Sequence, residues 1–212
     1  NGDTTNAATG NINSVDADPA DTKHYLAFDG LRHVGLVDNT NNQENVAAAI
    51  TFAKLLNART RMIDRTYLFD WGHPVDPTDL VYLAEPATAD AIAQLPEVLT
   101  VDKFGPGATV LTGQVARIGP HPLISTLAVP LTGTDGKVSA TPANNTKGQV
   151  VVFNRRGFVV GWRRRVKLET ERLMSTDQTR LIYSLRLGFG RYSPTGAASG
   201  IESADVLYNI TV

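Results

Sequence analysis

The stretch QVVVFNRRGFVVGWRRRVKL, residues 149–168, carries the clearest fold signal in this sequence. Residues 149–153 and 158–168 are rich in β-branched and aromatic side chains, which fit the half-buried surface of a sheet. The four residues between them, Asn154-Arg155-Arg156-Gly157, include types that favour turns. We therefore expect residues 149–168 to form a β-hairpin.

Strand-like segments continue on both sides of this hairpin. Residues 180–189 alternate in polarity, which predicts a strand with one apolar face. Residues 206–212 alternate in the same way, and we expect these two segments to be the closing pair of strands. The apolar face of 180–189 consists of Leu181, Tyr183, Leu185, Leu187 and Phe189. Further strands are expected at 80–84, from 109 to 117 and at 123–129, and a long loop at 132–149.

Two helices complete the expected secondary structure. Residues 43–57 place Val46, Ile50 and Leu56 at helical spacing, after possible N-caps at 40–42. A shorter helix is expected from Thr88 to Leu95, after the turn at Pro86. The sequence therefore predicts an α+β fold, with mixed antiparallel sheets and a few helices.

Composition excludes several classes of protein. The 212 residues contain no cysteine, which excludes disulfides, thiolate metal sites and a cysteine nucleophile. No stretch approaches the roughly 20 apolar residues of a membrane span, and no signal peptide is visible. The chain begins Asn1-Gly2-Asp3 without an initiator Met, so we expect a fragment or a processed product.

Charge is distributed unevenly along the chain. Residues 1–150 carry 10 Lys/Arg and 16 Asp/Glu, whereas residues 151–212 carry 10 and 5. The most basic feature is a run in which Arg163, Arg165 and Lys167 fall on one side of an ideal strand. Such a stripe can contact phosphates, or it can form salt bridges between copies of the chain. A solvated face is the third reading, and the sequence leaves all three open.

Signals for chemistry are weak. The four histidines are scattered, and no zinc-ligand or nucleophile-elbow pattern occurs. Asp64, Asp70 and Asp79 lie around Trp71 and His73, a set of carboxylates that a hydrolase could use as acid and base. Irregular turns rich in Asp and Pro explain the same residues. The glycine pair of Gly188-Phe189-Gly190 is typical of close backbone approach in a strand.

The order of these elements resembles one known family. Seven segments carry the resemblance, in the order in which they occur along the chain. The first four are Asn1-Gly2-Asp3-Thr4, a helix at 46–56, Asp79 to Pro86 with the helix to Leu95, and Gly113 to Thr126. The last three are the strands at 148–171, 180–190 and 206–212. Taken in this order, they resemble the C-terminal portion of the major capsid proteins of tailed bacteriophages, which have the Hong Kong 97-like fold. The resemblance implies an extended segment at 1–24, an axial-type domain at 25–168, and C-terminal strands of the peripheral-type domain at 169–212.

The resemblance also implies a function. It implies a structural, non-enzymatic subunit of an icosahedral capsid shell, which self-assembles around packaged double-stranded DNA. The expected partners are other copies in pentamers and hexamers, with no cofactor and no membrane. The expected location is the virion, and the host cytoplasm during assembly. Contacts at the axial tip are expected from Trp71, His73, Asp135 and Asn144. Two alternatives stay open, namely an encapsulin-like protein compartment and a small β-rich hydrolase using Asp64, Asp70 and Asp79.

Overall fold

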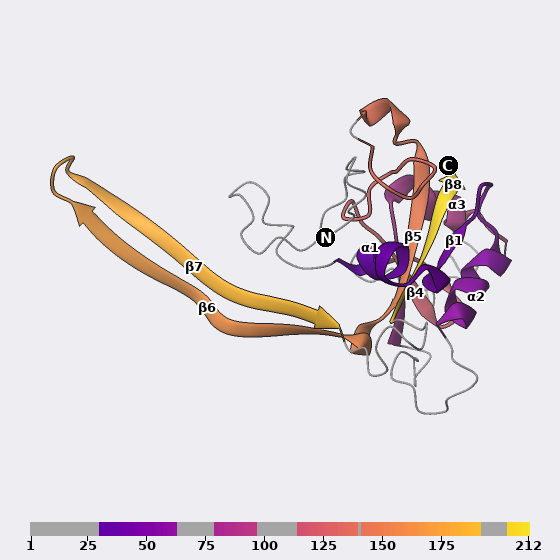
Figure 1. Cartoon of the computed structure of the whole chain (residues 1–212), viewed down its shortest axis with the longest axis horizontal. Helices are drawn as coiled ribbons and strands as arrows, with labels where there is room; N and C mark the ends of the chain where they lie inside the picture. The colour runs from indigo at the N-terminus through magenta and orange to yellow at the C-terminus, as the bar shows by residue number, and fades with distance from the viewer. Residues whose placement is uncertain (1–29, 63–78, 97–113, 140, 192–202) are drawn as a thin grey trace.

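The structure is a computed structural model, and it describes residues 30–62, 79–96, 114–139, 141–191 and 203–212. Strands dominate and helices are few in these residues, which confirms the predicted α+β class. Figure 1 shows a packed body from which two long strands, β6 (Phe158–Leu173) and β7 (Gln178–Arg191), project as an arm.

The body is built on one sheet of six strands in the order β1-β8-β5-β2-β4-β3. Two neighbouring pairs, β1–β8 and β2–β4, are parallel, and the other pairs are antiparallel. The sheet therefore joins segments from both ends of the described chain. Its strands are β1 (Gln43–Asn45), β2 (Leu80–Ala84), β3 (Gln114–Ile118), β4 (His121–Ser125), β5 (Lys147–Asn154) and β8 (Ala204–Thr211).

Short helices cover the sheet and connect its strands. In α3 (Pro86–Ala93), Pro86 occupies the first turn, where its missing N–H costs nothing. The Glu85 carboxylate caps the same turn by accepting a 3.0 Å hydrogen bond from the N–H of Thr88. The other helical segments are α1 (Leu31–His33), η2 (Val34–Asp38), η3 (Thr40–Asn42), α2 (Phe52–Arg61), η6 (Pro142–Asn144) and η7 (Arg155–Gly157). No helix among the described residues is long and apolar enough to cross a membrane.

The predicted helix at 43–57 is wrong in its position. Residues Gln43–Asn45 form β1 and pair in parallel with β8, and the helix α2 begins only at Phe52. Ala47 has a φ of 50°, which an α-helix cannot contain. Pairing with a strand more than 160 residues away thus overrides the local helical spacing.

The core lies on both faces of the sheet. In β5, Val150 and Val152 belong to the larger cluster, and Val151 belongs to the smaller one on the opposite face. Tyr82 is fully buried in the larger cluster, where its hydroxyl donates a 3.1 Å hydrogen bond to the carbonyl of Leu55. Each fully buried aliphatic side chain contributes about 2 kcal/mol to folding. The larger cluster also includes Ala58, Met62, Leu80, Ile92, Leu123, Leu207 and Ile210.

The predicted hairpin at 149–168 is also wrong. Both segments are strands, but β5 pairs with β2 on one side and β8 on the other, so both of its edges are occupied. Between them, η7 turns the chain out of the body, and β6 pairs with β7 instead. Residues 206–212 likewise lie in β8 beside β5 and β1, and not beside 180–190 as predicted. The domain boundaries at residues 24 and 168 stay predictions.

Candidate interaction surface: the two-stranded arm

The arm is an antiparallel hairpin whose pairing runs from Leu173↔Gln178 near its turn to Phe158↔Arg191 near the body, with two register shifts in the middle. It has its own sheet of only two strands. In the part of the chain that the structure describes, neither outer edge of the arm pairs with another strand. The backbone N–H and C=O groups along both edges therefore remain open to a partner.

The predicted basic stripe lies in the middle of β6. Arg163, Arg165 and Lys167 are all exposed, and Lys167 forms an ion pair of 2.5 Å with Glu169. Two register shifts occur here, between Trp162 and Arg164 and between Arg164 and Lys167. Such bulges bend a strand and interrupt its alternation. The three side chains are thus accessible but do not line an ideal strand face, and their contact with DNA or a neighbouring subunit stays a prediction.

One face of the arm is apolar along most of its length. Because β7 is continuous, Leu181, Tyr183, Leu185, Leu187 and Phe189 lie on one face, as predicted. Three residues of β6 face this row, in the pairs Val160↔Phe189, Trp162↔Leu187 and Leu168↔Tyr183. Tyr183 is 66% exposed and Trp162 is 58% exposed. A contiguous exposed apolar surface of this kind is typical of an interaction site.

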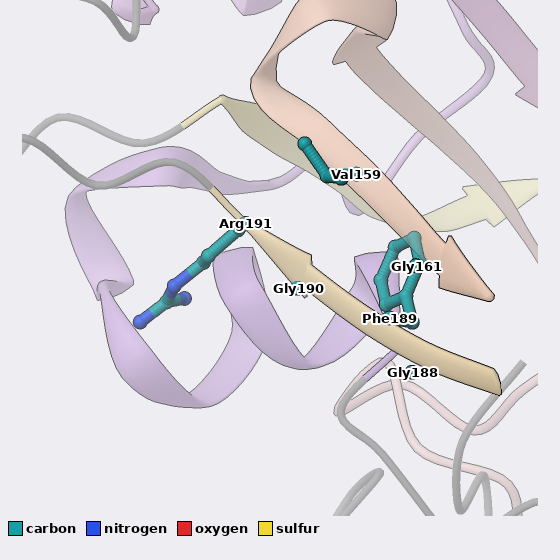
Figure 2. Close-up of a pocket in the computed structure, with 6 residues that line it drawn as sticks. All are labelled: Val159, Gly161, Gly188, Phe189, Gly190 and Arg191. Carbon is teal, nitrogen blue, oxygen red and sulfur yellow. The ribbon is translucent and has the colours of Figure 1, made fainter. Parts of the chain in front are cut away.

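A shallow hollow lies on the arm close to the body (Figure 2). Its floor is glycine, because Gly161 faces Gly188 and Val159 faces Gly190 across the two strands. The hollow has a volume of about 310 Å³, and Phe189 and Arg191 complete its lining. Figure 2 shows the Arg191 side chain directed away from the glycines, toward the helical turn of the body.

Aromatic contacts join the arm to the body at its base. The rings of Phe158 and Phe189 stack across the two arm strands, with centroids 5.6 Å apart. The ring of Phe153 in β5 meets Phe158 edge-on, at 6.2 Å. Gly157 packs so closely on Ser203 that a Cβ at this glycine would lie 2.3 Å from the Ser203 side chain. These contacts fix the position at which the chain leaves the body.

Ion pairs fix both strands of the arm to the body. At the start of β6, Nε of Arg156 lies 2.9 Å from the buried carboxylate of Asp79, and Arg155 lies 3.9 Å from it. At the end of β7, Arg191 donates a 2.6 Å hydrogen bond to Asp38. Of the three carboxylates proposed for a hydrolase, Asp79 therefore lies at the base of the arm, and Asp64 and Asp70 lie outside the described residues. No group of three or more potential metal ligands occurs among the described residues.

Two of the predicted tip residues, Asp135 and Asn144, lie in the connection between β4 and β5. The Asp135 carboxylate accepts a 3.0 Å hydrogen bond from the N–H of Lys137. The side-chain amide of Asn144 donates to the Ser139 hydroxyl at 3.4 Å. Both residues are exposed, and their part in subunit contacts stays a prediction. The other two, Trp71 and His73, lie outside the described residues.

No pattern in the sequence predicted the charged cluster that lies within the body. The Arg61 guanidinium donates two hydrogen bonds to Asp205, at 2.7 and 2.8 Å, and a third to Glu44, which also pairs with Lys54. Burial raises the pKa of Asp205 above its usual range although Arg61 opposes this effect. Burial also acts to raise the pKa of Glu44, but Lys54 and Arg61 together hold it below its usual range. The cluster ties α2 to β1 and β8.

Comparison with known proteins gives a likeness of fold alone. No protein-family model matches the chain, and no curated protein matches it. A solved structure from Mycobacterium phage Che8 aligns with a TM-score of 0.51 and 12% identity over 88% of this chain and 57% of that one. A chain in the head structure of Helicobacter pylori bacteriophage KHP40 aligns with a TM-score of 0.44 and 10% identity, over 89% and 66%. The chain thus spans less than two thirds of either relative.

The likeness to the Che8 structure shows that the fold is similar to that of a phage protein. The predicted resemblance to phage proteins is confirmed at this level, as a similarity of fold.

Proposed function

We propose that this chain is part of a bacteriophage major capsid protein with the Hong Kong 97-like fold, which assembles with copies of itself into an icosahedral shell. The observation that carries the proposal is the arm. Among the described residues, a packed body projects a hairpin with an exposed apolar face and two unpaired edges, and such a surface is typical of a site that a partner covers. The fold likeness to a phage structure supports it.

Such a shell subunit requires complementary surfaces and no reactive site, so the proposal includes no enzymatic activity and no cofactor. Residues 1–24 are the extended leading segment, 25–168 the axial-type domain and 169–212 strands of the peripheral-type domain. Pentamers and hexamers form through heterologous contacts around symmetry axes. The exposed loop with Asp135 and Asn144, and the segment with Trp71 and His73, supply contacts near those axes.

The shell encloses double-stranded DNA in this proposal. Arg163, Arg165 and Lys167 supply exposed positive charge, which can meet phosphates without reading sequence. The protein is then located in the virion, and in the host cytoplasm while shells assemble.

Electron microscopy tests the proposal. The protein, produced at its natural length, is expected to form closed shells of uniform diameter. Analysis of the contents of shells purified from infected cells distinguishes the roles, because nuclease-protected DNA supports a capsid and a packaged enzyme supports an encapsulin-like compartment. Protein that remains monomeric at every concentration contradicts a shell role.

A further inference from the structure

We propose that the glycine-floored hollow at the base of the arm, formed by Gly161, Gly188 and Gly190, receives an extended backbone segment of a second copy of this chain. The inference rests on the proposed shell function and names one of its contacts. It starts from the glycines themselves, for which the described part of the structure gives no reason.

No contact among the described residues requires any of the three glycines. A Cβ built at Gly161, Gly188 or Gly190 meets nothing within 4 Å. None has a positive φ, so any residue can adopt the backbone conformation. A glycine inside a regular element costs about 0.5–1 kcal/mol relative to alanine, because it loses more conformational freedom on folding. The three glycines therefore reduce the stability of the arm, and no contact in the described structure compensates for this loss.

What glycine provides at this place is access to the backbone. Without a Cβ on Gly161 and Gly188, which face each other, the peptide groups of both strands form an open floor. A glycine in a strand often marks a site where another backbone approaches closely. The half-exposed Val159 at the side of the hollow supplies an apolar wall for the approaching segment.

The arm also lacks the packing that a stable sheet needs. An isolated two-stranded hairpin is at best marginally stable in water, and a third strand or a packed layer is needed to stabilise it. Both edges of the arm are open in the described structure, and its apolar face is exposed. A segment packed over the hollow lies on the face opposite the apolar row, and it supplies the arm with one packed layer.

The net charge of the arm favours a second copy as the occupant of the hollow. Residues 158–191, the arm and its turn, carry eight Lys/Arg and three Asp/Glu, whereas the rest of the chain carries 12 and 18. An arm of net charge +5 is therefore complementary to the remainder of another copy, at −6. Nucleic acid fits the hollow poorly, because its lining is glycine and apolar except for Arg191, whose guanidinium is paired with Asp38.

The test fills the hollow without disturbing the fold. We expect Gly161→Val and Gly188→Val to melt at or above the temperature of the unmodified protein, since valine favours strands and meets no neighbour. Self-association, measured by analytical ultracentrifugation of the natural-length protein, is expected to weaken at least tenfold. Thr179→Val, an exposed strand position near the arm's turn, is the matched control and keeps the original association.

Cross-linking provides a measurement that is independent of folding variants. Because the chain contains no cysteine, Val159→Cys is a unique attachment point for a benzophenone photo-cross-linker. In a mixture of ¹⁵N-labelled and unlabelled copies, cross-links between the two isotopic forms are expected. If cross-links form only within single copies, the proposal is wrong.

The outcomes separate the docking site from the shell function. If both glycine variants assemble as well as the unmodified protein, the docking site is wrong and the shell function stands. If the unmodified protein never associates, both are wrong. Loss of shells in the glycine variants, with melting preserved and the control intact, supports both.

Discussion

Arg191 at the end of β7 donates a 2.6 Å hydrogen bond to Asp38, which lies 153 residues earlier in the chain. The other carboxylate oxygen of Asp38 lies 2.9 Å from Nε2 of His33. This ion pair therefore holds the returning strand of the arm to the helical turn of the body.

Asp38→Ala is expected to loosen the base of the arm without unfolding the body. Both partners of the ion pair are partly exposed, so the loss of global stability is expected to stay below about 1 kcal/mol. Amide hydrogen exchange at residues 189–191 is expected to accelerate. Asp177→Ala, which breaks the Arg172–Asp177 pair near the turn, is the control and leaves exchange at the base unchanged.

Gly157→Ala tests the close contact between η7 and Ser203. The added Cβ would lie 2.3 Å from the Ser203 side chain, so the chain must shift at the base of the arm. We expect a loss of about 1–3 kcal/mol in urea denaturation. Ser203→Gly in the same protein is expected to restore part of it, and equal stability of the single and double variants would contradict the steric cause.

Tyr82→Phe tests a polar contact inside the core. The tyrosine hydroxyl donates to the Leu55 carbonyl at 3.1 Å, and the tyrosine is fully buried. Removal of one buried hydrogen bond of this kind costs about 1 kcal/mol. Urea denaturation measures the free energy of unfolding of Tyr82→Phe and of a surface control, Thr179→Ser. If Tyr82→Phe unfolds with the same free energy as the unmodified protein, the hydroxyl makes no net contribution to stability.

The burial of His121 predicts how the stability of the body changes in acid. Its ring is buried beside Tyr82, with centroids 6.1 Å apart, and neither ring nitrogen has a hydrogen-bond partner among the described residues. Burial, with smaller effects of Arg59 and Arg117, lowers the pKa of His121 to about 4. An unfolded histidine titrates near pH 6.5, so between these values the unfolded chain binds a proton that the folded chain does not.

Stability is therefore expected to be fully present above about pH 6.5 and to fall as the pH decreases toward 4, by up to about 3 kcal/mol from this residue. Urea denaturation at pH 7, 5.5 and 4.5 measures the slope. His121→Phe, which keeps an aromatic ring, is expected to reduce the slope over this range. Identical slopes in the two proteins would remove His121 as the cause.

Local side-chain patterns predicted individual strands well where the pattern is clear. The apolar run Leu80–Ala84 is β2 with those bounds, because a short apolar run flanked by Pro86 has few other structures open to it. The alternation of 180–189 correctly gave the apolar face of β7. In both segments the side-chain pattern alone determines the structure.

Pairing between distant segments could not be predicted in the same way. Residues 149–153 and 158–168 are close in sequence and both extended, but the three residues of η7 separate a buried strand from an exposed one. The arm base also depends on distant partners, such as Asp79 with Arg156. The sequence showed Gly188 and Gly190 only as a weak signal and did not single out Gly161, since nothing local indicates that Gly161 faces Gly188.

The chain leaves and rejoins the body at a single point. The N–H of Asn154, at the end of β5, donates a 2.9 Å hydrogen bond to the carbonyl of Ser203, just before β8, and Phe153 pairs with Ala204. The chain between Asn154 and Ser203 thus begins and ends at positions that already touch, and the entropic cost of closing it rises only slowly with its length. The arm can therefore be lengthened, shortened or exchanged here without a change in the pairing of the six-stranded sheet. For the same reason, a foreign peptide can be grafted in its place.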